Sequence, residues 1–173
     1  MKIGFIGLGN MGAPMVKRLV ASGHDITGYD VMESAMAALS EVKMSFSKDI
    51  LTAAREQDVV ITMLPNGEAL TKVVEAIIPV MPKGSCFIDC STVDINTTRQ
   101  VATLLKNAAI HVLDAPVSGG VGGAVAGTLT FMVGGSEDSF AIGNPLFKSM
   151  GQRVIHCGAD GAGQAAKICN NMI

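Results

Sequence analysis

Three glycines near the N-terminus follow an apolar, strand-like run with the spacing G-x-G-x-x-G. The stretch reads Gly7, Leu8, Gly9, Asn10, Met11 and Gly12. After it comes a helical pattern with apolar residues on one face. In a strand-turn-helix unit, Gly7 permits the tight turn, Gly9 lets the backbone approach a pyrophosphate, and Gly12 lets the helix pack on the strand. The free N–H groups at the start of the helix then bind the phosphates, so these residues predict a dinucleotide site.

An acidic residue follows the second apolar run. Residues 24–29 read as a strand, and Asp30 comes about 20 residues after the glycines, where a carboxylate accepts hydrogen bonds from an adenosine ribose. Asp30 would repel the 2′-phosphate of NADP, and no Arg follows it closely, so we predict NAD as the cofactor and NADP as the less favoured alternative. The competing interpretation is an ordinary strand-turn-helix unit with an incidental acid.

We expect strands over residues 58–64 and 85–89, and each is followed by a further loop. Open parallel sheets bind ligands at the carboxyl ends of their strands. We therefore expect Leu64 and Pro65, together with Ser91 and Thr92, to flank the ribose on the nicotinamide side. The alternative is that these four are simply turn residues.

The elements that must position these residues alternate between strand-like and helical patterns. This alternation predicts an α/β fold of the Rossmann type, with a doubly wound, mostly parallel sheet covered on both faces. We expect helices over residues 32–39, 48–56, 68–81 and 94–107, and strands over 43–46, 111–115, 128–133 and 153–157.

Two segments are expected to interrupt this pattern. Residues 116–123 contain four glycines and a serine, which argues against a core element, and a small helical piece should follow near Ala124. Residues 136–150 begin like a capped helix, but the run Gly143-Asn144-Pro145 should break or restart it.

The composition narrows the class of protein. The 173 residues are 49% hydrophobic and 16% charged, which predicts a compact globular domain. A formal net charge of −2, no Trp and a single Tyr disfavour a nucleic-acid partner. No apolar run is long enough to span a membrane, and the N-terminus does not resemble a signal sequence. We expect a soluble, cytoplasmic protein without a membrane partner.

The four cysteines are Cys86, Cys90, Cys157 and Cys169. They form no C-x-x-C pair, and no His stands at zinc-like spacing, so neither a metal site nor a redox motif is predicted. Cys86 and Cys90 fall in one predicted strand, too far apart for a disulfide. We expect buried, reduced thiols.

The last segment, residues 161–173, begins with good helix formers and ends on Met172 and Ile173 without a stop signal. We expect the chain to end inside a helix. The expected division is a dinucleotide-binding domain over residues 1–160 and the start of an interdomain helix over residues 161–173.

Three motifs together resemble the β-hydroxyacid dehydrogenase family, especially its 3-hydroxyisobutyrate dehydrogenases and semialdehyde reductases. They are the glycine motif at residues 7–12, the run Asp114-Ala115-Pro116-Val117-Ser118-Gly119-Gly120, and the run Gly163-Gln164-Ala165-Ala166-Lys167-Ile168-Cys169-Asn170-Asn171. The last two are far more specific than the first. The resemblance spans essentially the whole chain.

This resemblance implies that Ser118, Gly119 and Gly120 bind the substrate carboxylate, that Lys167 is the general acid/base, and that Asn171 orients the substrate. It implies hydride transfer between NAD and a small 3-hydroxy acid or its semialdehyde, with 3-hydroxyisobutyrate as the expected substrate. It also implies a helical second domain, almost all of it missing here, that completes the cleft and usually a homo-oligomer. We expect these 173 residues alone to be inactive.

The residue types suit this chemistry. Lys167 and Asn171 are four residues apart, so on a helix they share one face and can reach the same ligand. A serine hydroxyl with glycine N–H groups holds a carboxylate well. The related 6-phosphogluconate dehydrogenases carry a histidine at the position of Asn170, which counts against a sugar-phosphate substrate.

Three alternatives stay open at this point. One is an NADPH-dependent reductase of glyoxylate, tartronate semialdehyde or succinic semialdehyde, and the second is a non-catalytic dinucleotide-binding module. The third is that Lys167 is a solvated helix residue and the Ser118 segment a flexible loop.

Overall fold

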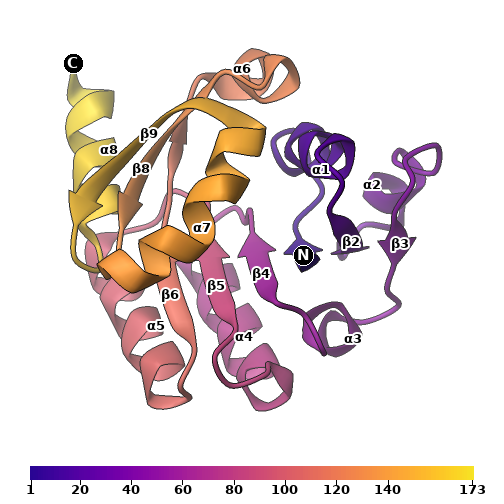
Figure 1. Ribbon diagram of the computed structural model, residues 1–173, viewed down its shortest axis with the longest axis horizontal. Coiled ribbons are helices and arrows are strands. Elements are labelled where there is room, and N and C mark those ends of the chain that lie inside the picture. The colour runs from indigo at the N-terminus through magenta and orange to yellow at the C-terminus, as the bar shows by residue number, and fades with distance from the viewer.

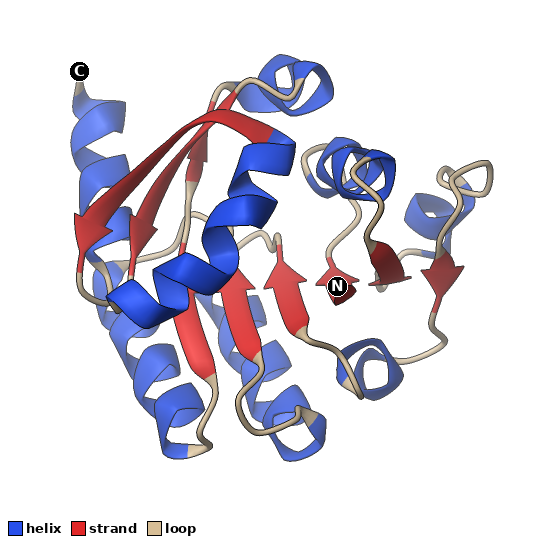
Figure 2. Ribbon diagram, in the orientation of Figure 1, coloured by secondary structure: helices blue, strands red, loops and turns tan.

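A nine-stranded sheet runs through the centre of the molecule, with helices on both faces (Figures 1 and 2). The computed structural model describes residues 1–173. The strands are β1 (Lys2–Ile6), β2 (Asp25–Tyr29), β3 (Ser45–Phe46), β4 (Val59–Thr62), β5 (Cys86–Asp89), β6 (His111–Asp114), β7 (Val117–Ser118), β8 (Leu129–Gly134) and β9 (Gly151–Gly158). The helices are α1 (Gly12–Ala21), α2 (Glu33–Ala37), α3 (Ile50–Ala54), α4 (Gly67–Ile77), α5 (Ile95–Asn107), α6 (Gly120–Ala126), α7 (Glu137–Met150) and α8 (Ala162–Met172).

The strand order confirms the predicted Rossmann-type fold. It reads β3-β2-β1-β4-β5-β6-β8-β7, and β9 pairs with β8. Strands β1 to β6 pair in parallel, whereas β8 runs antiparallel to β6 and β7. The chain leaves β1 toward β2 on one side and returns to β4 on the other. The carboxyl ends of β1 and β4 therefore flank the switch point where open α/β sheets bind ligands.

The core has two layers because successive strand residues face opposite sides of the sheet. In β4, Val59 and Ile61 belong to one apolar cluster and Val60 belongs to the other. Helices α1 and α7 cover the first cluster, and α4 and α5 cover the second (Figure 1). This burial on both faces explains why the central strands read as nearly continuous apolar runs.

Four helices begin at a side chain that caps them. Asp49, Asn66, Asp94 and Ser136 each accept a hydrogen bond from a backbone N–H in the first turn, of α3, α4, α5 and α7 respectively. Several predicted helices are shorter than expected, and the end of the one predicted over residues 68–81 becomes a 3-10 turn at Ile78–Val80.

The predicted break in the seventh helix is wrong. Helix α7 runs without interruption from Glu137 to Met150, with Pro145 inside it. Pro145 cannot donate a hydrogen bond to the preceding turn, but the following residues Leu146, Phe147 and Met150 are completely buried. Apolar burial against the sheet therefore outweighs the local preference of the Gly143–Pro145 run.

The expectation for the glycine-rich segment 116–123 is also wrong. Val117–Ser118 forms the short strand β7, which pairs with β8, and α6 begins as early as Gly120. Gly119 and Gly120 have φ angles of +129° and +61°, a conformation that lets the chain turn from strand to helix within two residues. The glycines thus build a tight strand-to-helix junction instead of a loop.

All four cysteines are free thiols. Cys86 and Cys90 are buried as predicted, although β5 ends at Asp89 and Cys90 lies just beyond it. Burial raises the pKa of Cys86 to about 12. None of the helices is both long and apolar enough to cross a bilayer.

Candidate functional site

A cavity of about 760 Å³ opens at the carboxyl ends of β1, β2 and β4. The structure brings most of the predicted cofactor residues together around it. Those that line it are Gly7, Gly9, Asn10, Met11, Gly12, Asp30, Leu64 and Pro65. Leu8 lies beneath the turn, with its side chain in the core.

The glycine turn has the geometry expected from its sequence. Gly7 has a φ of +101°, which favours glycine. A Cβ on Gly12 would lie 1.9 Å from the carbonyl oxygen of Gly7, so only glycine lets α1 approach the turn this closely. A Cβ on Gly9 would meet no protein atom within 4 Å and would project into open space. The phosphate-binding role of Gly9 stays a prediction.

The residues around the cavity fit a dinucleotide. No side chain caps the start of α1, and its first turn has no acidic residue, so its positive end is open to an anion. After β2, the Asp30 carboxylate lies against the glycine turn, where it accepts hydrogen bonds from the N–H of Leu8 at 2.7 Å and from the N–H of Met32 at 2.8 Å. These bonds fix the carboxylate, and its remaining lone pairs can accept from a ribose hydroxyl.

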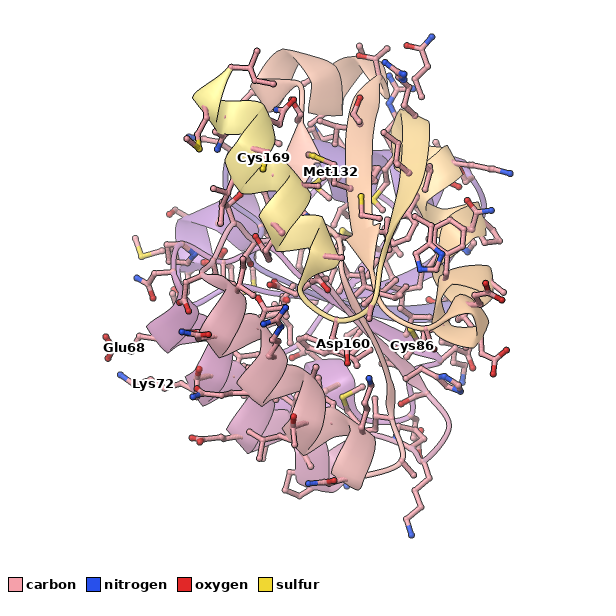
Figure 3. All side chains as sticks on the ribbon, turned by 90° about the vertical axis from the view of Figure 1, so that its left-hand side faces the viewer. Glu68, Lys72, Cys86, Met132, Asp160 and Cys169 are labelled. Atoms are coloured by element: carbon pink, nitrogen blue, oxygen red, sulfur yellow. The ribbon has the colours of Figure 1, made fainter.

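Sequence reasoning missed part of the cavity wall. The additional side chains come from the end of β2, the start of α3 and one face of α4. They are Tyr29, Val31, Ile50, Ala69, Lys72 and Val73, and Ile6 at the end of β1 and Met63 just after β4 complete the wall. The spacing of the α4 residues at i, i+3 and i+4 marks one helix face, and this signal could have found them. Lys72 pairs with Glu68 at 2.7 Å on the outer surface of α4 (Figure 3).

Ser91 and Thr92 do not line the cavity. Ser91 is fully buried, and its hydroxyl accepts a hydrogen bond from the N–H of Leu64 at 2.8 Å. Thr92 is exposed. Ser91 therefore holds the backbone of the loop after β4 in place through this hydrogen bond and does not face the cavity.

The residues of the second and third motifs meet at α8. Ser118 is half-buried at the end of β7, and Gly119 and Gly120 are exposed beside it. The Nδ2 atom of Asn170 lies 3.4 Å from the hydroxyl of Ser118, so α8 runs alongside this segment. On the same helix, Lys167 is half-buried and Asn171 is exposed.

Two buried carboxylates lie on neighbouring strands near the start of α8, where Asp89 pairs in register with Asp114. Burial raises the pKa of Asp89 to about 6. Its Oδ1 accepts from Thr62 Oγ1 and from the N–H of Ser91, whereas Oδ2 has no partner. Burial also raises the pKa of Asp114, and hydrogen bonds from two backbone N–H groups oppose that shift. No group of three His, Cys, Asp or Glu side chains is arranged to hold a metal ion.

A family model for the NAD binding domain of 6-phosphogluconate dehydrogenase matches residues 2–158. The chain belongs to this family. The fold and the cavity at the switch point agree with that assignment, and the predicted resemblance to the β-hydroxyacid dehydrogenases is confirmed.

Named relatives resemble this NAD-binding domain along its whole length. A "Probable 3-hydroxyisobutyrate dehydrogenase" of Mycobacterium tuberculosis is 44% identical over 171 residues, which cover 99% of this chain and 58% of the relative. An "NAD-dependent L-serine dehydrogenase" of Pseudomonas aeruginosa is 40% identical over 175 residues, covering 99% and 59%. The chain thus spans less than two thirds of these relatives.

The solved structure of Mycobacterium tuberculosis 3-hydroxyisobutyrate dehydrogenase with L-serine superposes on the NAD-binding domain with a TM-score of 0.97. It is 44% identical in sequence, and the match covers 99% of this chain and 59% of that one.

Proposed function

We propose that the protein to which this NAD-binding domain belongs is an NAD-dependent oxidoreductase of small 3-hydroxy acids. Its proposed reaction converts 3-hydroxyisobutyrate to methylmalonate semialdehyde. The observation that carries the proposal is the contact between Asn170 and Ser118, because it brings the helix of Lys167 to the segment suited to a carboxylate. The name of the mycobacterial relative supports the choice of substrate.

In this proposal each residue type has one task. The hydroxyl of Ser118 and the backbone N–H groups of Gly119 and Gly120 hold the substrate carboxylate. The amine of Lys167 takes the proton of the 3-hydroxyl group as the carbon–hydrogen bond at C3 breaks, which leaves a carbonyl. Asn171, one helical turn after Lys167, orients the substrate.

The cofactor is held by residues around the 760 Å³ cavity. The first turn of α1 binds the pyrophosphate, Asp30 binds the adenosine ribose, and Leu64 and Pro65 contact the other ribose. When bound, NAD accepts the hydride that leaves C3.

L-Serine is a second candidate substrate, because a 40% identical relative is named for it and a 44% identical structure contains it. L-Serine also has a carboxylate and a 3-hydroxyl group, and it differs at C2, where an amine replaces the methyl group. The NADPH-dependent semialdehyde reductases are a weaker alternative because Asp30 disfavours the 2′-phosphate. A purely binding module has no evident use for a lysine on the helix that contacts the Ser118 segment through Asn170.

Turnover assays on the complete protein that contains these residues test the proposal. Purified protein would be given 3-hydroxyisobutyrate, L-serine, glycerate and 4-hydroxybutyrate with NAD and with NADP. We expect the highest kcat/KM for 3-hydroxyisobutyrate with NAD. Absence of turnover on every acid, with NAD still bound, would favour the binding module.

The cofactor preference gives a prediction for Asp30. The wild-type chain should bind NADH more tightly than NADPH, and Asp30→Ala should narrow this difference because it removes both a ribose acceptor and a negative charge beside the 2′-phosphate. Calorimetric titration of both cofactors measures it. Tighter binding of NADPH by the wild-type chain would contradict the assignment.

We also propose the division into residues 1–160 and 161–173, which is supported by the end of the family match at residue 158 and by the start of α8 at Ala162. A homo-oligomer and a cytoplasmic location stay predictions.

A further inference from the structure

The first turn of α8 is held by a buried carboxylate. Asp114 Oδ1 accepts a hydrogen bond from the N–H of Gly161 at 2.8 Å, and Oδ2 accepts from the N–H of Gln164 at 3.0 Å. Asp114 is only 3% exposed. It satisfies backbone donors that the helix itself leaves open and places a negative charge at the positive end of α8.

A second buried side chain ties the same turn to another loop. Gln164 is fully buried, its Nε2 donates to the carbonyl of Ser91 at 2.8 Å, and its Oε1 accepts from the N–H of Val93 at 3.3 Å. A buried amide needs such partners, so the bonds select one position of α8 relative to the loop between β5 and α5.

That loop also contacts the cofactor side. The hydroxyl of Ser91 holds the N–H of Leu64, and Leu64 lines the cavity. The connection from the cavity to α8 therefore runs from Leu64 through Ser91 to Gln164. Lys167 comes three residues after Gln164, on the next turn of the helix.

Close packing prevents α8 from settling elsewhere. A Cβ on Gly163 would lie 2.4 Å from the carbonyl oxygen of Met132 and 2.7 Å from that of Asp114. Helix α8 packs along β8, and Figure 3 shows this helix, with Cys169 labelled, in front of the strand that carries Met132. The helix is thus pressed against the sheet, and the Gln164 bonds set its place along the β5–α5 loop.

We propose that Gln164 is a positioning residue for the reaction: it sets the place of Lys167 relative to the cofactor cavity by fixing the first turn of α8 to Ser91 and Val93. The proposal rests on the proposed function, in which Lys167 moves the proton. Gln164 itself does not line the cofactor cavity, and its side-chain amide bonds only to the backbone of Ser91 and Val93.

The test compares variants of the complete protein. Gln164→Met keeps the length of the side chain and removes both hydrogen bonds. We expect kcat to fall about 10- to 100-fold, since a shift of about 1 Å in a catalytic group can cost that much. NADH affinity should hold, because the bond from Leu64 to Ser91 does not involve Gln164. The limb of the pH profile that depends on Lys167 should shift, and hydrogen exchange of the α8 amides should accelerate.

A matched control removes another buried polar group away from α8. Ser139 on α7 is 2% exposed and bonds to His111 and Ser136. Ser139→Ala should leave the pH profile and the α8 exchange at their wild-type values. If Gln164→Met does not fold, Gln164→Asn, which keeps the amide but is one methylene shorter, serves in its place.

The outcomes separate the two proposals. A wild-type protein that oxidises no 3-hydroxy acid would overturn the proposed function together with the catalytic part of this inference. In an active protein, unchanged α8 exchange and an unshifted pH limb in the Gln164 variants would overturn the positioning role alone.

Discussion

Replacing Lys167 by Met in the complete protein should lower kcat by about 10²–10⁴-fold while NADH still binds. The substitution keeps most of the length of the side chain and removes the amine that, in the proposed function, takes the hydroxyl proton. The cofactor cavity should be unaffected because Lys167 does not line it. Steady-state rates with 3-hydroxyisobutyrate and titration with NADH measure the two quantities.

The pH profile provides an independent measurement. A catalytic lysine contributes a limb to the profile of kcat/KM, and this limb should be missing from the residual activity of Lys167→Met. Asn171→Ala should lower the rate but keep the limb, because the role proposed for that residue is to orient the substrate without moving a proton. A Lys167→Met variant with most of its wild-type kcat and an unchanged profile would show that Lys167 is only a solvated helix residue.

Asp89→Asn should make the chain more stable at pH 8 by about 3 kcal/mol, with little difference near pH 4. Burial raises the pKa of Asp89 in the folded state to about 6, above its value of about 3.9 in an unfolded chain. The folded state therefore binds the proton more tightly. The contribution of the protonated Asp89 to the free energy of unfolding is fully present below about pH 4 and is lost as the pH rises through about 6. Asparagine never ionises, so it escapes this loss.

The local structure suits the substitution. Asparagine keeps an oxygen for the bonds from Thr62 and Ser91. Its amide nitrogen would replace Oδ2, which has no hydrogen-bond partner. Asp89 lines a void of about 10 Å³ together with Thr98, whose hydroxyl also has no partner. Urea unfolding from pH 4 to pH 8 measures the effect. Thr62→Val is the companion variant, because it removes a hydrogen-bond donor that lowers the pKa of Asp89. In this variant, the pH range over which the free energy of unfolding falls should move to higher pH. If the free energy of unfolding changed with pH in the same way in the wild type and in Asp89→Asn, the prediction would be contradicted.

The fold and the cofactor cavity could be predicted because their signals are local in sequence. The spacing of Gly7, Gly9 and Gly12 follows from turn geometry, and Asp30 follows one strand later. The alternation of apolar runs and helical patterns was sufficient to predict that the central strands pair in parallel. Each of these inferences needs only neighbouring residues and one rule of chain geometry.

The features that were missed depend on contacts between distant residues. Packing of α7 against the sheet outweighs the Gly143–Pro145 run, and pairing with β8 turns Val117 and Ser118 into a strand. The side-chain amide of Gln164 bonds to a loop far earlier in the chain, and its partner Ser91 lies 73 residues before it. No local pattern records such a pairing.

Strand β6 has a consequence for protein engineering. Asp114 at its end caps α8, and Ser118 follows only four residues later in the same segment. Grafting a specificity loop from a relative is therefore safest from residue 117 onward, with Asp114 left in place. A graft that began at residue 114 or earlier would exchange the residue that anchors α8 together with the proposed carboxylate-binding residues, so a change intended for substrate choice would also move the helix that carries Lys167.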